Sequence, residues 1–163
     1  MALTSYAIAL GSNRRSRHGS PAETVRAAAD ALGARRLSRI RATAAVGPAG
    51  RAFANAAGLV ESALEPPDLL SLLKGIERDF GRRGGRRWGP RVLDLDIILW
   101  SEGSWAENGL VVPHPEFRRR GFVLEPLAEL LPGWRDPVTG ATVRQLLHRL
   151  RRSRPVDRAP ARS

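Results

Sequence analysis

The segment at residues 92–99, Val-Leu-Asp-Leu-Asp-Ile-Ile-Leu, constrains the fold of this chain more than any other feature. It is rich in Leu and Ile and short enough to form a strand. Because side chains alternate between the two faces of a strand, Asp94 and Asp96 are expected on one face. The opposite face would carry Leu93, Leu95 and Ile97. The segment therefore predicts a sheet strand with a carboxylate pair on one side and a core on the other.

Two carboxylates held on one strand face repel each other unless a cation or a proton lies between them. Mg²⁺ is typically held by one or two such carboxylates together with substrate phosphates. Upstream, the run Arg-Arg-Trp-Gly-Pro-Arg at residues 86–91 offers phosphate donors and a flat aromatic surface. A strand whose solvent face happens to carry two acids is the simpler alternative, and this setting disfavours it. Asp94 and Asp96 are therefore predicted metal ligands.

The chain is predicted to be one α+β domain over residues 1–150, a mostly antiparallel sheet covered by helices. Strands are expected at 6–10, 37–46, 53–64 and 92–99, and helices at 21–32, 68–80, 121–131 and 143–150. Residues 101–113 look irregular. The Arg- and Pro-rich stretch 151–163 is predicted to be a disordered tail. No apolar run is long enough for a membrane span and no signal peptide is evident, so we expect a cytoplasmic protein without membrane contact.

The formal charge of +11 suggests nucleic-acid binding, but the composition weakens that interpretation. Lys74 is the only lysine, so the excess is almost entirely arginine, as in a general compositional bias. The chain also has one tyrosine and four phenylalanines, and no run resembles the aromatic motifs of RNA-binding sheets. An RNA-binding α+β module is therefore the weaker alternative, and no nucleic-acid partner is expected.

Phosphate binding would need side chains here, because neither the P-loop nor the dinucleotide-binding glycine motif is present. The guanidinium fork matches phosphate oxygens with two parallel hydrogen bonds. Five arginines precede or enter the predicted strand: Arg82, Arg83, Arg86, Arg87 and Arg91. Trp88, in the glycine-rich loop among them, suits closure over a flat ligand better than a place in the core. His114, between two prolines, is a weaker candidate for a phosphate contact.

Four blocks of this chain resemble the 6-hydroxymethyl-7,8-dihydropterin pyrophosphokinase family of folate biosynthesis. The most specific is Arg-Trp-Gly-Pro-Arg leading into Leu-Asp-Leu-Asp, at residues 87–96. The others are Ala-Leu-Gly-Ser-Asn at 9–13, Phe-Ala-Asn-Ala-Ala at 53–57, and Val-Pro-His at 112–114 followed by Arg-Gly-Phe at 120–122. The similarity spans about residues 5–150. It implies a ferredoxin-like α+β fold with mobile active-site loops.

The resemblance also implies a reaction: transfer of the β,γ-diphosphate of ATP to the hydroxymethyl group of the pterin, with release of AMP. Two Mg²⁺ ions are expected on Asp94 and Asp96, with ATP as co-substrate. The implied catalytic set is Arg82, Arg91, Asp94 and Asp96. The implied ATP contacts are Lys74, Glu77, Arg82, Arg83, Arg87, Trp88, Arg91, Ile97, His114 and Arg120. The implied pterin contacts are Thr43, Val46, Phe53, Asn55, Trp88 and Phe122.

Some positions depart from the family pattern. Thr43 is followed by two alanines where the family commonly has Thr-x-Pro, and the arginine-rich loop is one residue short. An inactive relative is a further alternative, disfavoured because the two aspartates, Asn55 and both stacking aromatics are retained. We expect small-molecule substrates and a monomer.

Overall fold

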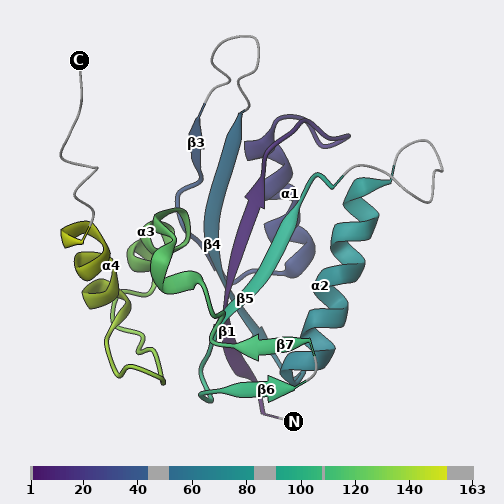
Figure 1. Ribbon diagram of the computed structural model, residues 1–163. Coiled ribbons are helices and arrows are strands. Elements are labelled where there is room, and N and C mark those ends of the chain that lie inside the picture. Colours follow the sequence, from purple (N-terminus) through teal and green to yellow (C-terminus); the bar gives the residue numbers. More distant parts are fainter. Residues whose placement is uncertain (1, 44–51, 83–90, 108, 154–163) are drawn as a thin grey trace, which may run out of the picture.

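The computed structural model describes residues 2–43, 52–82, 91–107 and 109–153. Its main sheet lies between two pairs of helices (Figure 1). The strands are β1 (Thr4–Ser12), β2 (Arg36–Leu37), β3 (Arg41–Thr43), β4 (Phe53–Ser62) and β5 (Asp94–Trp100). All the described strand pairs are antiparallel, with β4 beside β1, β2 and β3, and β5 on the other side of β1. The predicted α+β class is confirmed.

Four helices cover the two faces of this sheet. The helices α1 (Pro21–Leu32) and α2 (Pro66–Gly81) cover one face, and α3 (Gly121–Leu130) and α4 (Val143–Arg152) lie on the other (Figure 1). Capping boxes begin α1 at Ser20 and α4 at Thr142, since each hydroxyl accepts a backbone N–H of the first turn. All four predicted helices are therefore present, with ends within two residues of those expected.

The alternation predicted for β5 is confirmed by burial. Leu93, Leu95 and Ile97 are at most 3% exposed and pack in the core beneath α1 and α2. Asp94 and Asp96 lie on the opposite face, toward α3. A register shift between Ala7 and Ile8 of β1 makes the neighbouring β5 irregular beyond Ile97.

Two segments differ from the sequence prediction. Residues 101–113 are not irregular throughout, because they contain the hairpin of β6 (Trp105–Glu107) and β7 (Leu110–Val112). Its Trp105 packs edge-on against Trp100 of β5, with ring centroids 5.9 Å apart, a side-chain contact that strand patterning does not reveal. The extended segment predicted at 37–46 is divided into β2 and β3, because Ser38 between them turns its hydroxyl to accept the Ala57 N–H.

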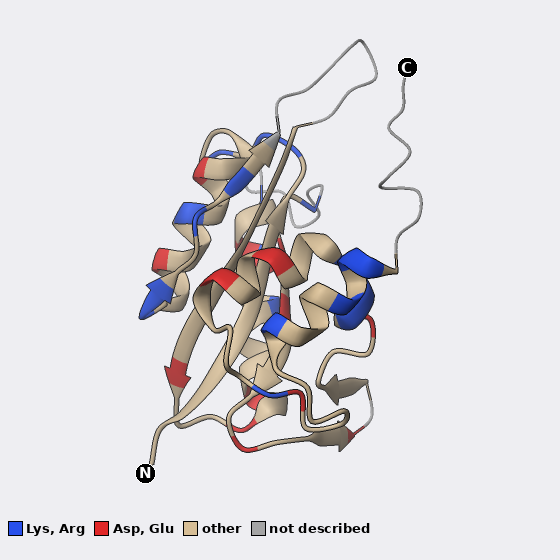
Figure 2. Cartoon of the chain, turned by 90° about the vertical axis from the view of Figure 1, so that its left-hand side faces the viewer, with Lys and Arg blue, Asp and Glu red and all other residues tan. Residues whose placement is uncertain are grey.

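The C-terminal boundary also differs. The tail predicted at 151–163 begins too early, since α4 runs to Arg152 on the apolar support of α3. The last turn of α4 is basic, with three arginines that gather at its end (Figure 2). Residues 154–163 lie outside the described part of the chain. Among the described residues, no helix is both long and apolar enough to cross a membrane.

A largely buried ion pair connects the segment before α3 to the loop between α3 and α4. The 3₁₀ helix η1 (Phe117–Arg119) carries Arg118, whose Nε and Nη2 donate to the two carboxylate oxygens of Asp136 at 2.5 and 2.8 Å. Asp136 has no exposed surface and also accepts the Val138 N–H and the Thr139 hydroxyl. Burial alone would raise the pKa of Asp136, but these hydrogen bonds, led by that of Arg118, lower it to about 2.

The low pKa of Asp136 predicts that the fold loses stability in acid and that Asp136→Asn removes this part of the pH dependence. Because the folded-state pKa lies below the ordinary value of 3.8, Asp136 stabilises the fold above about pH 4, and this contribution is lost as the pH falls toward 2. The shift corresponds to about 2 kcal/mol. Between pH 5 and pH 2 the wild-type free energy of unfolding should fall by about 2 kcal/mol more than that of Asp136→Asn, measured by urea denaturation. Equal pH dependence in the two proteins would contradict this assignment.

Candidate active site

Two adjoining cavities open on the α3 side of the sheet. The larger has a volume of about 850 Å³ and the smaller about 450 Å³. Four residues line both of them: Gly11, Asn55, Asp94 and Phe122. The larger continues toward β3 and α3, and the smaller toward Asp96 and the segment before α3. The two volumes are therefore parts of one site, shared between three strands and α3.

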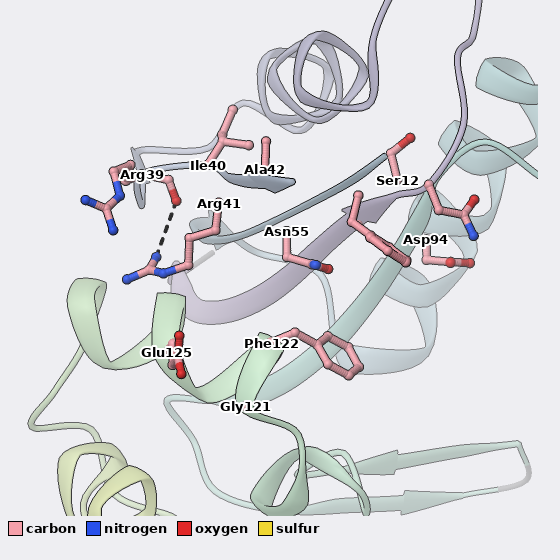
Figure 3. A pocket seen from close by; sticks show the side chains of 13 residues that line it. Ser12, Arg39, Ile40, Arg41, Ala42, Asn55, Asp94, Gly121, Phe122 and Glu125 are labelled. Carbon is pink, nitrogen blue, oxygen red and sulfur yellow. Dashed lines mark hydrogen bonds between the residues drawn. The ribbon is translucent and has the colours of Figure 1, made fainter. Parts of the chain in front are cut away.

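The pairing register of β1, β4 and β5 determines which residues lie beneath the two cavities, on their shared floor. Gly11 of β1 pairs with Asn55 of β4 on one side and with Asp94 of β5 on the other. Residues paired across antiparallel strands point to the same face of the sheet. Three positions that are distant in sequence thus form one row under both cavities. Figure 3 shows Asn55 and Asp94 on this floor with Phe122 projecting over it from α3.

Gly11 leaves room for the Asn55 amide. A Cβ added at Gly11 would lie 3.0 Å from Asn55 Oδ1, so the amide would have to shift by a few tenths of an ångström. If a ligand in the larger cavity forms hydrogen bonds with the Asn55 amide, Gly11→Ala should weaken its binding by about fivefold. This corresponds to the loss of roughly one hydrogen bond. Calorimetric titration with the pterin that the family resemblance implies measures this. Gly58→Ala is the matched control, because its Cβ would meet the side chain of Leu10, which does not line the larger cavity. Wild-type affinity in Gly11→Ala would show that Asn55 does not need its present position.

Two phenylalanines face the larger cavity from opposite sides. Phe53 begins β4 and Phe122 lies in the first turn of α3, and their side chains are 48% and 55% exposed. Apolar surface that is exposed around a cavity is typical of a ligand-binding groove. Together with the Asn55 amide the two rings form a slot suited to a flat ligand with hydrogen-bonding edges. The predicted contacts Phe53, Asn55 and Phe122 are therefore brought together.

The carboxylate pair lies in the smaller cavity. Asp94 and Asp96 both line it, with Asp94 more exposed than Asp96. The Arg91 guanidinium forms an ion pair with Asp94. Two hard oxygen donors open to solvent fit Mg²⁺, which keeps water and phosphate ligands in its remaining positions. No group of three or more His, Cys, Asp or Glu side chains suited to a metal occurs among the described residues.

His114 and Arg120, the predicted phosphate contacts, also line the smaller cavity. The backbone N–H of His114 donates to the Ile98 carbonyl at 3.0 Å, which fixes the turn against the edge of β5. His114 Nδ1 accepts the Glu116 N–H at 3.1 Å, so Nε2 is the nitrogen left for a ligand. Arg120 precedes α3 with its guanidinium 5.9 Å from the Phe122 ring centroid. The cavity thus joins two acids to two basic groups, an arrangement suited to a metal-bound polyphosphate.

Besides Arg91, which pairs with Asp94, and Thr43, four predicted residues are described but do not line either cavity. Arg82 pairs loosely with Asp79 at 3.9 Å after α2. Lys74 is exposed on α2, 3.8 Å from Glu77, whose carboxylate accepts the Leu95 N–H at the outer edge of β5. Ile97 is buried in the core. Glu77 and Ile97 therefore lie along β5 but on the α2 side, away from the carboxylate pair.

Other predicted residues cannot be placed. Val46, Arg83, Arg87 and Trp88 lie outside the described residues, as do the greater parts of the loops expected to be mobile. The backbone of Thr43 pairs with Phe53, which puts it at the rim of the larger cavity.

Sequence reasoning missed the end of the larger cavity that lies away from the carboxylates. There Arg39, Ile40 and Arg41 line the cavity together with Glu125 of α3 (Figure 3). Glu129, one turn further along α3, accepts the Arg39 N–H at 2.8 Å and pairs with Arg41 at 2.9 Å. These contacts, the Arg39 N–H foremost, lower the pKa of Glu129. No local motif marks this wall, because it forms only when the β2–β3 segment meets α3.

The missed floor residues did carry a signal. Gly11, Ser12 and Asn13 all line the larger cavity and belong to the Ala-Leu-Gly-Ser-Asn block that carries the family resemblance.

The fold and this site define a class of protein: an α+β domain with adjoining cavities whose lining suits a flat polar ligand beside an anionic one. Residues 7–132 match the family described as 7,8-dihydro-6-hydroxymethylpterin-pyrophosphokinase. Two relatives are each named 2-amino-4-hydroxy-6-hydroxymethyldihydropteridine pyrophosphokinase. The one from Synechocystis is 42% identical over 106 residues, covering 65% of this chain and 54% of the relative. The one from Pseudomonas aeruginosa is 41% identical over 139 residues, covering 80% and 82%.

The chain belongs to this family of pyrophosphokinase enzymes. In a crystal structure of wild-type Plasmodium falciparum HPPK-DHPS, the similar part covers 91% of this chain and 41% of that one, with a TM-score of 0.69 and 12% identity. That likeness concerns the fold, and it confirms the expected ferredoxin-like α+β architecture. This chain thus spans less than half of that structure and about half of the Synechocystis relative.

Proposed function

We propose that the protein transfers the β,γ-diphosphate of ATP to the hydroxymethyl group of 6-hydroxymethyl-7,8-dihydropterin and releases AMP, as a step of folate biosynthesis. The observation that carries this proposal is the shared floor of the two cavities. An aromatic slot and a carboxylate pair meet at Gly11, Asn55 and Asp94, so an acceptor alcohol in one cavity would lie beside a phosphate in the other.

The larger cavity suits the pterin. A planar bicycle would stack between Phe53 and Phe122, as aromatic rings prefer, and leave its polar edge free for directional contacts. The Asn55 amide offers both a donor and an acceptor to such an edge. Backbone groups near Thr43 and Val46, and Trp88 from the arginine-rich loop, would complete this half of the site.

The smaller cavity suits the triphosphate. Asp94 and Asp96 would hold two Mg²⁺ ions together with phosphate oxygens, and Arg91 would then exchange its ion pair with Asp94 for a phosphate. His114 and Arg120 already face this space. Arg82, Arg83 and Arg87 would approach from the loop before β5. Lys74, Glu77 and Ile97 would lie toward the nucleoside, beyond the outer edge of β5.

In this arrangement catalysis is mainly positioning and charge stabilisation. The pterin alcohol would attack the β-phosphorus in line with the departing AMP oxygen. Magnesium, when bound, supplies charge neutralisation on the phosphate oxygens. The arginines and His114 would orient the triphosphate for in-line attack and stabilise the negative charge on the leaving AMP. No side chain among the described residues is assigned as a general base.

Product analysis tests the proposal. The protein is mixed with Mg²⁺, ATP and 6-hydroxymethyl-7,8-dihydropterin, and the nucleotide products are separated by chromatography. We expect AMP and the diphosphate ester of the pterin in equal amounts. Neither product should form without Mg²⁺. ADP would indicate a different phosphoryl transfer. Strongly salt-dependent RNA binding without AMP formation would favour the RNA-binding alternative. A monomeric state and a cytoplasmic location stay predictions.

A further inference from the structure

The ion pair of Arg118 with Asp136 has a place in the molecule that core packing alone does not explain. Neither residue lines either cavity. Arg118 belongs to η1, the single turn of 3₁₀ helix that separates His114 from Arg120. The pair therefore holds the segment that supplies both basic side chains of the smaller cavity, and it does so from the side facing away from that cavity.

The Asp136 side of the pair is rigid. Its carboxylate accepts four hydrogen bonds, two from Arg118, one from the Val138 N–H and one from the Thr139 hydroxyl. Its backbone closes the same turn, since the Asp136 N–H donates to the Ala141 carbonyl at 2.9 Å and its carbonyl accepts the Gly140 N–H at 2.8 Å. A carboxylate held at both oxygens gives a guanidinium fork one position and one orientation.

Backbone hydrogen bonds connect η1, which carries Arg118, to His114 and Arg120. The Arg120 N–H donates to the Phe117 carbonyl at 3.3 Å, and the Phe117 N–H donates to the His114 carbonyl at 3.3 Å. The Phe117 side chain is fully buried, with the Arg118 guanidinium 4.8 Å from its ring centroid. Movement of η1 would therefore displace the backbone of both His114 and Arg120.

We propose that Arg118 and Asp136 are positioning residues that hold His114 and Arg120 in register with Asp94 and Asp96 for a metal-bound triphosphate. The identity of that ligand rests on the proposed function. The positioning itself rests on the contacts of η1. Arg118 acts on the ligand through its neighbours, because it makes no contact with the cavity.

Arg118→Met tests the proposal, with Arg119→Met as its matched control. Arg119 is the next residue of η1, its side chain is 74% exposed, and it pairs only with Glu116 among the described residues. Both variants remove one positive charge from η1, so the change in net charge is shared. We expect Arg118→Met to weaken binding of a non-hydrolysable ATP analogue with Mg²⁺ by about tenfold or more, since small displacements of binding groups are costly. Arg119→Met should stay within about twofold of the wild type.

Two further readouts separate positioning from general destabilisation. Binding of the pterin, assigned to the larger cavity that His114 and Arg120 do not line, should weaken less in Arg118→Met than binding of the ATP analogue. The chain has three histidines, so the imidazole resonances of His114 are readily assigned by NMR. They should shift in Arg118→Met and not in Arg119→Met, with no ligand present. Equal loss of affinity in both variants, or an unshifted His114, would overturn the proposal.

Arg118→Lys covers the case in which the methionine variant does not fold. Lysine keeps the charge and loses the two-point fork. An intermediate loss of analogue affinity, about threefold, with a shifted His114 resonance supports positioning by the fork. Affinity and His114 resonances equal to those of the wild type would overturn it. A wild type that binds no ATP analogue, while His114 still shifts only in the Arg118 variants, would contradict the proposed function and leave the positioning inference supported.

Discussion

Asp94→Asn and Asp96→Asn are each expected to lower turnover by about 10²-fold or more. Asparagine has almost the same size and shape as aspartate, but it brings no negative charge to offset a bound cation. The effect on turnover should exceed that of replacing either stacking phenylalanine, since both carboxylates line the cavity assigned to the triphosphate. AMP formation at several Mg²⁺ concentrations measures it.

The two variants should differ in detail. Asp94 is bound by Arg91 and lines both cavities, whereas Asp96 lines only the smaller one. Asp94→Asn should therefore also free Arg91 and alter pterin binding, while Asp96→Asn should affect only the nucleotide and metal. Neither should reduce the free energy of unfolding, because removing one of two neighbouring negative charges relieves repulsion.

Asp30→Asn is the control for these variants. Asp30 is exposed on α1, on the opposite face of the sheet, and its replacement changes the net charge by the same amount. Its turnover should equal that of the wild type. If Asp94→Asn and Asp96→Asn both keep near-normal activity at saturating Mg²⁺, the metal assignment is wrong.

Phe122→Ala is expected to weaken pterin binding by roughly tenfold to a hundredfold, the range for losing one aromatic stacking partner of a heterocyclic base. The residue is 55% exposed, so its loss should change the free energy of unfolding by about 1 kcal/mol or less. Fluorescence or calorimetric titration with the pterin gives the affinity, and urea denaturation gives the stability.

Leu72→Ala provides the comparison. Leu72 is 47% exposed on α2 and lines neither cavity, so it tests the loss of an exposed apolar side chain away from the site. Pterin affinity should be unchanged there. Phe53→Ala should resemble Phe122→Ala, since the two rings face the same slot. Unchanged affinity in both phenylalanine variants would place the pterin elsewhere.

The sequence was sufficient for those parts of this protein that depend on neighbours along the chain. The alternation of Asp94 and Asp96 with leucines follows from the geometry of any strand, and the helix starts at Ser20 and Thr142 follow from local capping. The expected phosphate contacts of His114 and Arg120 came from family resemblance. The structure brings both side chains into the cavity of the carboxylate pair.

Only the tertiary structure decided which distant residues meet. Strand register is a non-local property, so the row of Asn55, Gly11 and Asp94 under the two cavities exists only once β4, β1 and β5 have paired. Two other contacts also exist only in the folded chain. Glu129 pairs with Arg39 and Arg41, and Asp136 forms an ion pair with Arg118. A single aspartate or glutamate in a loop or on a helix surface has no local signature, because its role depends on which cation the fold brings to it.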